Sequence, residues 1–253
     1  MKILFFVAFL ISSAIVGYAQ PSQPIHVAVA ANLLFPMKKI EQLFESQHQQ
    51  KINLISASSG VLTAQINNGA PYHLFLSADM KYLQTLAENG KTLTEPQVLV
   101  RGRLVFWSRQ KVTEDQLEQY LKNDPIKSVA MAQPALAPYG QATKNWLQKE
   151  KIFEEIENKL VYGENVGQVN RYIYSGAVDA AFTAVSAMFS EELKDKGHWL
   201  LLSAEKEDAE LLAHGWVILK SASNEMDIVR QFVAFLSAPQ AKAVFQEFGY
   251  MIP

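Results

Sequence analysis

The chain has 253 residues, of which 49% are hydrophobic and 19% are charged, with a formal net charge of −2 and no cysteine. This composition supports a large apolar core and excludes a disordered chain. The near-neutral charge argues against a nucleic-acid-binding protein, whose contact surface is strongly basic. The absence of cysteine excludes disulfides, thiol catalysis and thiolate zinc sites. The length fits one large domain or two lobes, at about 150 residues per domain.

The first twenty residues have the pattern of a secretory signal peptide. Lys2 precedes an apolar stretch from Ile3 to Val16, and small residues follow, so cleavage is expected after Ala19. The apolar stretch is shorter than the ~20 residues that a membrane-spanning helix requires. The sequence therefore predicts a signal peptide over residues 1–19 and a mature protein in the bacterial periplasm, with full secretion as the alternative. A lipid anchor is not expected, because no cysteine follows this segment.

Short apolar runs then alternate with segments of helical periodicity. Strands are predicted at residues 26–31, 52–56, 74–77, 104–107, 128–131, 160–162, 178–182 and 216–219. Helices are predicted at residues 33–44, 61–66, 82–87, 117–121, 141–150, 167–174, 225–236 and 239–248. Thr113 and Gln116 form a capping box ahead of the fourth helix. This alternation predicts an α/β fold with a parallel sheet flanked by helices.

The sequence contains no convincing catalytic or metal-binding motif. Glycine-rich nucleotide loops, HExxH, EF-hand loops and the GxSxG nucleophile elbow are absent. Residues 108–111 fit the SxxK acylation motif, but its partner motifs are missing and the segment closes a predicted strand. The five histidines are scattered, without the spacing of metal ligands. We therefore expect no catalytic residue, no cofactor and no protein side chain bound directly to a metal.

Small or polar residues directly precede a predicted helix at four strand-to-helix turns. These four turns lie at residues 31–32, 58–60, 138–140 and 165–167. Backbone N–H groups at a helix N-terminus are unpaired and carry partial positive charge, so they bind anions without lysine or arginine. In open α/β sheets such turns line the crevice at the carboxyl ends of the strands. Two facing lobes could bring all four turns together on one small oxyanion.

Each of these turns also has an ordinary explanation, because Asn and Ser are common N-caps and Gly is common in turns. None of the four contains Lys or Arg, and Glu164 is the one acidic residue beside them. A site made of donors suits a fully deprotonated dianion, because a protonated oxyanion requires an acceptor for its hydrogen. Asp79 is a tempting acid, but we interpret it as the cap of a helix that begins at Met80.

Seven blocks along the chain carry a resemblance to one protein family. They are Val27–Asn32, Ala57–Gly60, Gly69–Pro71, Leu74–Asp79, Ala137–Gly140, Glu164–Val166 and Phe248–Pro253. In these blocks the sequence resembles the periplasmic molybdate-binding proteins of bacterial ABC importers, which are type II solute-binding proteins. Within that family it resembles the branch that has Ala-Ala-Asn at the first turn. Ser-Ala-Asp shortly after Gly-Ala-Pro is specific to that family, whereas the C-terminal block is shared more widely among solute-binding proteins.

The resemblance implies a two-lobed α/β periplasmic solute-binding protein that closes on molybdate or tungstate. Each lobe would hold a mainly parallel sheet flanked by helices, and the chain would cross between the lobes near Val100–Gly102 and Ala213–Gly215. Lobe one would comprise residues 20–101 and 215–253, and lobe two residues 102–214, with the ligand cleft between them. The implied partners are the oxyanion and the permease subunits of an ABC importer. The protein is expected to be a monomer that neither spans a membrane nor binds nucleic acid.

The resemblance also gives five residues of the four turns a role in binding. Asn32 would donate from its side-chain amide nitrogen, with Ala31 as a backbone neighbour. Ser59 would donate through its hydroxyl and its backbone N–H. Tyr139 and Val166 would each donate a backbone N–H. The resemblance therefore implies a ligand that is held entirely by neutral hydrogen-bond donors.

One donor of the family is missing from this chain. Many members use a tyrosine just after the strand predicted at residues 178–182, where this sequence has Ala184. We hypothesise that the hydroxyl of Tyr139 supplies the lost donor.

Two alternative functions stay open at this point. The same fold could bind another small oxyanion or an organic anion, which an Arg or Asp in the cleft would favour. A secreted hydrolase could instead use Ser58 or Ser59 as its nucleophile. The hydrolase requires a nearby base, and none of the five histidines lies within the four turns.

Overall fold

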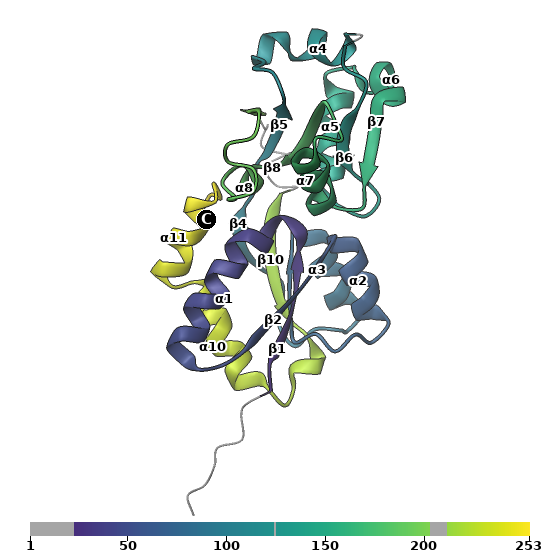
Figure 1. The fold of residues 1–253 in the computed structure, drawn as a ribbon. Coiled ribbons are helices and arrows are strands. Elements are labelled where there is room, and N and C mark those ends of the chain that lie inside the picture. The colour runs from purple at the N-terminus through teal and green to yellow at the C-terminus, as the bar shows by residue number, and fades with distance from the viewer. Residues whose placement is uncertain (1–22, 124, 203–211) are drawn as a thin grey trace, which may run out of the picture.

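The computed structural model describes residues 23–123, 125–202 and 212–253, so the predicted signal peptide lies outside the described residues. These residues form two lobes, each built on a five-stranded sheet with helices packed against it (Figure 1). The predicted two-lobed α/β architecture is confirmed. Within the described ranges, no helix combines the length and the apolar content needed to cross a membrane.

The first lobe has the strand order β2-β1-β3-β10-β4. Its strands are β1 (Ile25–Ala30), β2 (Ile52–Ala57), β3 (Leu74–Ser77), β4 (Gln97–Arg101) and β10 (Ala213–Ile218). Its helices are α1 (Leu34–His48), α2 (Ser59–Asn67), α3 (Met80–Glu88), α10 (Met226–Leu236) and α11 (Pro239–Glu247), with short 3-10 turns η1 (Ala31–Leu33) and η3 (Lys220–Ala222). One apolar cluster packs the sheet against α1, α10 and α11, and another packs it against α2 and α3. Strand β1 is apolar along nearly its whole length because both of its faces are covered.

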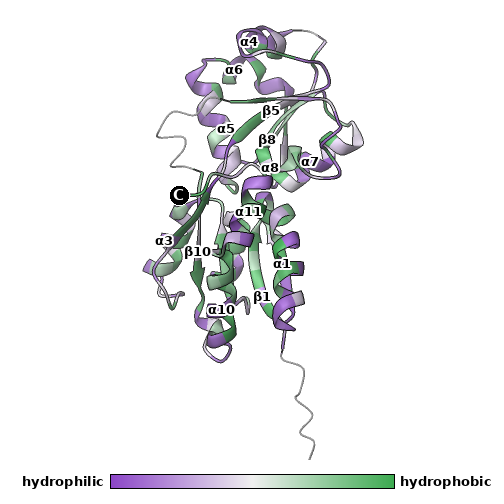
Figure 2. Cartoon of the chain, turned by 90° about the vertical axis from the view of Figure 1, so that its left-hand side faces the viewer, coloured by the Kyte–Doolittle hydropathy of each residue, from purple (hydrophilic) through white to green (hydrophobic). Residues whose placement is uncertain are grey.

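The second lobe has the strand order β7-β6-β8-β5-β9. Its strands are β5 (Leu104–Ser108), β6 (Val129–Ala132), β7 (Leu160–Gly163), β8 (Ala180–Ala184) and β9 (His198–Leu201). Its helices are α4 (Glu114–Lys122), α5 (Pro138–Lys149), α6 (Phe153–Ile156), α7 (Val166–Ser175) and α8 (Val185–Met188), with the 3-10 turn η2 (Glu157–Lys159). The predicted capping box of Thr113 and Gln116 is present at the start of α4. Figure 2 shows apolar strands inside both lobes, whereas hydrophilic colour gathers on outer helices such as α4.

Both sheets are mixed, whereas the alternation predicted a parallel sheet and the resemblance implied mainly parallel sheets. Strand β1 is parallel to β2 and β3, and β6 is parallel to β7 and β8. Strand β10 is antiparallel to β3 and β4, and β5 is antiparallel to β8 and β9. The strands β5 and β10 lie inside their sheets, and each is the first described strand of its lobe after the chain has left the other lobe. They do not arrive through a crossover helix within their own sheet, so no such connection requires them to be parallel.

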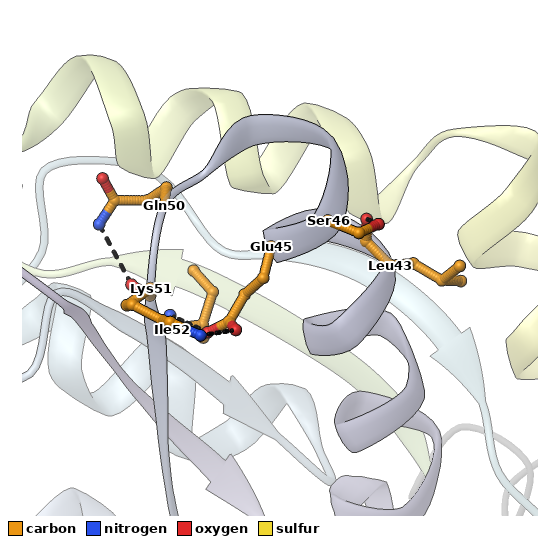
Figure 3. Close-up of polar contacts among 6 residues, drawn as sticks. All are labelled: Leu43, Glu45, Ser46, Gln50, Lys51 and Ile52. Carbon is orange, nitrogen blue, oxygen red and sulfur yellow. Dashed lines mark hydrogen bonds and ion pairs between the residues drawn. The ribbon is translucent and has the colours of Figure 1, made fainter.

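A hydrogen-bonded turn connects α1 to β2 (Figure 3). The chain leaves α1 at Gln49, whose backbone is left-handed with φ of 53°. The Glu45 carboxylate then accepts from the backbone N–H of Ile52 at 2.9 Å and from Lys51 Nζ at 2.6 Å. Burial raises the pKa of Glu45, but the bonds from Lys51 and Ile52 outweigh it and hold the pKa below its usual value. The carboxylate therefore fixes the start of β2.

Glu45→Gln is expected to lower the free energy of unfolding at pH 7 by about 1 kcal/mol, because a neutral amide is a weaker acceptor than a carboxylate. Urea denaturation measures the change. Lys51→Gln is the matched control and should change stability less, because the Lys51 side chain is 73% exposed and exposed ion pairs contribute little. A lowered carboxyl pKa stabilises the fold above the unfolded pKa, so the difference between wild type and Glu45→Gln should shrink below about pH 4. Equal urea midpoints at pH 7 would contradict this role.

Candidate functional site between the lobes

A small pocket lies where the two lobes meet. The described residues that line it are Ala30, Ala31, Asn32, Ser58, Ser59, Ala78, Ala137, Pro138, Tyr139, Asn165 and Val166. They come from all four of the predicted turns, and all five residues that the resemblance singled out are among them. None of these lining residues is charged. In the described part of the chain, no three His, Asp or Glu side chains gather closely enough to hold a metal ion.

Helix N-termini from both lobes meet at this pocket. Asn32 lies in η1, which leads directly into α1, and Ser59 is the first residue of α2. From the second lobe, Tyr139 is the second residue of α5, after a proline that suits the first position, and Val166 is the first residue of α7. Helix geometry leaves the first backbone N–H groups of each helix without a partner inside the helix. The pocket is therefore surrounded by unpaired backbone donors and by the positive ends of helix dipoles.

The N-caps of α2 and α7 determine which of these donors stay unpaired. The Oγ of Ser58 accepts from the backbone N–H three residues later at 3.4 Å, and the Oδ1 of Asn165 does the same at 3.1 Å. Each cap therefore pairs the third N–H of its helix. The first N–H of each helix, on Ser59 and on Val166, is left for an acceptor in the pocket.

The hydroxyl of Ser59 is also oriented by the fold. Its Oγ accepts from the backbone N–H of Ala78 at 3.0 Å, and the residue is 1% exposed. Because this oxygen already accepts one bond, its own proton remains to be donated to another group.

Asp79, which follows Ala78 in the chain, is the N-cap of α3 and accepts from the N–H of Tyr82 at 3.1 Å, as predicted. Burial raises the pKa of Asp79, although the hydrogen bonds from the Tyr82 N–H and the Ser77 hydroxyl oppose the shift.

The side chain of Asn32 is used differently from the prediction. Its Nδ2 donates to the hydroxyl of Tyr250 at 2.9 Å and also contacts Nε2 of His214. Both hydrogens of the amide nitrogen are thereby occupied, so this nitrogen is not free to donate into the pocket. These contacts lie at the hinge, by which we mean residues 101–104 and 212–214, where the chain passes between the lobes. The backbone N–H of Asn32, in the first turn of η1, is the donor that remains.

His214 accepts from Asn32 because it is held in one neutral tautomer. Its Nδ1 lies 2.8 Å from the carbonyl oxygen of Leu212, which can only accept, so Nδ1 carries the proton and Nε2 is the acceptor. Burial lowers the pKa of His214 to about 4, although the bond to Leu212 opposes this shift. The ring is therefore neutral at pH 7.

The hydroxyl of Tyr139 does not fit the hypothesis that it replaces the donor missing at Ala184. The hydroxyl lies at the hinge, so close to Gly102 that an added Cβ there would clash with it, and its ring centre is 5.9 Å from that of His214. Neither of these hinge residues lines the pocket. Among the described residues, the Tyr139 Oη is the one buried side-chain polar atom without a hydrogen-bond partner. Tyr139 therefore remains a candidate through its backbone N–H alone.

Hydrogen bonds join the two lobes around the pocket. The N–H of Gly60, in α2, donates to the carbonyl of Leu136 in the second lobe at 2.9 Å. The hydroxyl of Ser186, in α8, donates to the carbonyl of Asn32 at 2.8 Å. A Cβ at residue 60 would lie only 2.9 Å from the Leu136 carbonyl oxygen, so this approach requires glycine. The lobes are in contact at the pocket, as in a closed clamp.

The fold and the site can be compared with known proteins. Residues 25–251 match the family described as bacterial extracellular solute-binding protein. The molybdate-binding protein ModA of Azotobacter vinelandii is 28% identical, covering 95% of this chain and 94% of the relative. ModA of Rhodobacter capsulatus is 30% identical, covering 94% of this chain and 92% of the relative.

Solved structures show the same architecture. The Azotobacter vinelandii periplasmic molybdate-binding protein has a TM-score of 0.83 at 29% identity, covering 90% of this chain and 99% of that chain. The sulfate-binding protein SubI of Mycobacterium tuberculosis has a TM-score of 0.71 at 11% identity, covering 90% of this chain and 86% of that chain. The likeness to SubI concerns the fold alone.

Proposed function

Because the chain belongs to the family of bacterial extracellular solute-binding proteins, we propose that it captures molybdate in the pocket between its lobes. The ModA relatives, which are matched over most of their length, support this ligand. In the proposal, closure of the lobes buries the oxyanion and presents a closed surface to the permease subunits of an ABC importer. The protein acts as a monomer in the periplasm, after removal of residues 1–19, and performs no catalytic step.

The observation that carries this proposal is the character of the pocket, which offers donors and no charged side chain. We assign the ligand to the N–H groups of Asn32, Ser59, Tyr139 and Val166 and to the Ser59 hydroxyl, with Ala31 as a backbone neighbour. All of these residues line the pocket. Helix N-termini stabilise negative charge through unpaired N–H groups and the helix dipole. No Asp or Glu among the described lining residues repels a dianion.

Tungstate has the same charge and the same tetrahedral shape as molybdate, so we propose that the pocket binds both. Sulfate is also a tetrahedral dianion and requires the same donors, but it is smaller. Discrimination against sulfate must therefore come from the size of the cavity, which is set by the backbone positions of the helix starts.

Isothermal titration of the mature chain with molybdate, tungstate and sulfate tests the proposed ligand. We expect tight binding of molybdate and tungstate and weak binding of sulfate. Equal affinity for sulfate would contradict the assignment. Failure of all three to bind, together with binding of a phosphate ester or an organic anion, would favour the alternative ligand class.

The hydrogen bonds of the pocket serines support binding over serine catalysis. The Oγ atoms of Ser58 and Ser59 each accept from a backbone N–H group. Among the histidines in the described part of the chain, His214 contacts the pocket residue Asn32, and its Nε2 already accepts from the Asn32 amide. A base for a nucleophilic serine is therefore missing from the described contacts. Labelling of the protein by a serine-reactive fluorophosphonate probe would contradict this conclusion.

Tyr139→Phe is expected to keep the affinity for molybdate within about threefold of wild type, because the lost hydroxyl lies at the hinge. The variant should be as stable as wild type or more stable by up to about 1 kcal/mol, because an unpaired buried hydroxyl carries a desolvation cost. Calorimetric titration measures the affinity, and urea denaturation measures the free energy of unfolding. A loss of affinity of more than tenfold would restore the hydroxyl as a ligand donor.

A further inference from the structure

A cluster of buried polar side chains connects the pocket to the hinge. Its members are Asn32, Tyr139, Ser186, His214 and Tyr250, each at most 3% exposed. Asn32, His214 and Tyr250 belong to the first lobe, because they follow β1, lie in β10 and pack in the first lobe's core. Tyr139 and Ser186 are the second residues of α5 and α8, which belong to the second lobe. The cluster is therefore complete only when the lobes are in contact.

Each hydrogen bond of the cluster has an assigned donor and acceptor. The Nδ2 of Asn32 donates to Nε2 of His214 and to the hydroxyl of Tyr250. The Tyr250 hydroxyl in turn donates to the backbone carbonyl of Asn32 at 2.7 Å. A flipped Asn32 amide would place its oxygen against the lone pair of Nε2, so the neutral histidine permits one amide orientation. His214 and Tyr250 thereby fix both the side chain and the peptide of Asn32.

The same cluster joins the two passages of the chain between the lobes. The carbonyl of Leu212, which precedes β10, accepts from His214 Nδ1 at 2.8 Å and from the backbone N–H of Gly102 at 3.0 Å. Gly102 lies between β4 and β5 and also makes room for the Tyr139 hydroxyl. A rotation at the hinge would therefore strain the bonds that hold His214 in place.

The peptide of Asn32 receives bonds from both lobes. Its carbonyl oxygen accepts from Tyr250 within the first lobe and from the Ser186 hydroxyl across the cleft, at 2.8 Å. We propose that His214 is a positioning residue which, with Tyr250, holds Asn32 as a latch that Ser186 engages when the lobes close. Because Asn32 lines the pocket, the latch couples closure at the hinge to retention of the ligand. The retention step rests on the proposed function, whereas the closure step does not.

The latch predicts which binding rate changes when it is removed. Ser186→Ala removes one bond that forms on closure, so molybdate should dissociate about three- to tenfold faster while its association rate stays within about twofold. His214→Leu leaves a buried Asn32 hydrogen without an acceptor, and dissociation should be about tenfold faster or more. His214→Gln supplies an acceptor again and should return the rate to within about threefold of wild type. A general loss of structure would not give this split between rates, nor rescue by glutamine.

Ser190→Ala is the matched control, because Ser190 is also buried and its hydroxyl donates to a carbonyl of its own helix region, at 2.7 Å from Ala187 O. It should leave the dissociation rate unchanged. Stopped-flow competition with excess tungstate measures dissociation for all variants. Equal rates in wild type, Ser186→Ala and His214→Leu would overturn the latch.

A second measurement separates the latch from the proposed ligand. The sequence has no cysteine, so Gln84→Cys and Gln119→Cys, at exposed positions on α3 and α4, can carry a pair of fluorescent dyes. Energy transfer in the ligand-free protein should show a smaller closed fraction in Ser186→Ala and His214→Leu than in wild type or Ser190→Ala. If wild type binds no molybdate, the proposed function fails while this comparison still tests the latch. Equal closed fractions in all variants would overturn the latch even if molybdate binds.

Discussion

Val166→Pro should weaken molybdate binding by about 10- to 100-fold while the protein stays folded. Val166 is the first residue of α7, and its N–H has no partner inside the helix. Proline at this position removes that N–H without breaking a helical hydrogen bond, and its fixed φ suits the first turn. The preceding Asn165 is extended, with φ of −152° and ψ of 172°, as a residue before proline must be. The substitution therefore deletes one proposed ligand donor and also changes the buried apolar side chain of Val166, which is 3% exposed.

The size of this effect follows from the charge of the ligand. A hydrogen bond to a charged group contributes about 1.5–3 kcal/mol, which corresponds to roughly one to two orders of magnitude in affinity. Val166→Ala keeps the N–H and is the matched control, with an affinity close to that of wild type. Calorimetric titration gives the affinities, and urea denaturation checks that the proline variant is folded. Unchanged affinity in Val166→Pro would remove this residue from the site.

The free energy of unfolding should fall by roughly 2 to 3 kcal/mol between pH 7 and pH 4.5 because of His214. Burial lowers the pKa of His214 in the folded protein to about 4, whereas an unfolded chain has the ordinary value near 6.5. Between these two values the unfolded chain takes up a proton that the folded protein does not. The unfolded state is therefore favoured as the pH falls, and the stability due to neutral His214 is present in full only above the unfolded pKa.

His214→Gln tests this dependence because glutamine keeps an acceptor for Asn32 and does not titrate. Carboxylates with lowered pKa, such as Glu45 and Asp179, also lose stability in acid. They act equally in both proteins, so the difference between wild type and variant isolates His214. Urea denaturation at several pH values should give a shallower fall for His214→Gln than for wild type. Parallel curves between pH 7 and pH 4.5 would show that His214 is not the buried neutral ring described above.

The strands inside the two sheets and the edge strands β2 and β7 could be predicted from the sequence, whereas the edge strands β4 and β9 could not. Residues 74–77 form β3 as predicted, because that strand is buried on both faces and is a continuous apolar run. The edge strands β4 and β9 were missed although each contains three consecutive apolar residues; each begins with two exposed residues and is only partly buried. The strand predicted at 178–182 is shifted to 180–184, where Thr183 and Ala184 extend β8 with weak apolar signal. The mixed sheets depend on the hinge passages, which no local pattern describes.

The turns that line the pocket could be predicted from the sequence, whereas the contacts of their side chains could not. Capping residues and glycines at four helix starts indicated the turns that line it, because these residue types have a local physical reason to occur there. The contacts of the Asn32 side chain could not be predicted, because they are made with His214 and Tyr250, which are 182 and 218 residues away in the sequence. A histidine inside the predicted second crossing was the one signal that could have drawn attention to the hinge. Spacing along the chain gives no information on contacts of that range.

Diffraction at the molybdenum absorption edge, from crystals grown with molybdate, tests the central claim most directly. The account predicts one strong anomalous peak between the first turns of α2, α5 and α7. The oxygens around that peak should accept hydrogen bonds from the Ser59 hydroxyl and from the N–H groups of Tyr139 and Val166. A peak elsewhere, or no peak in the pocket at saturating molybdate, would contradict the account.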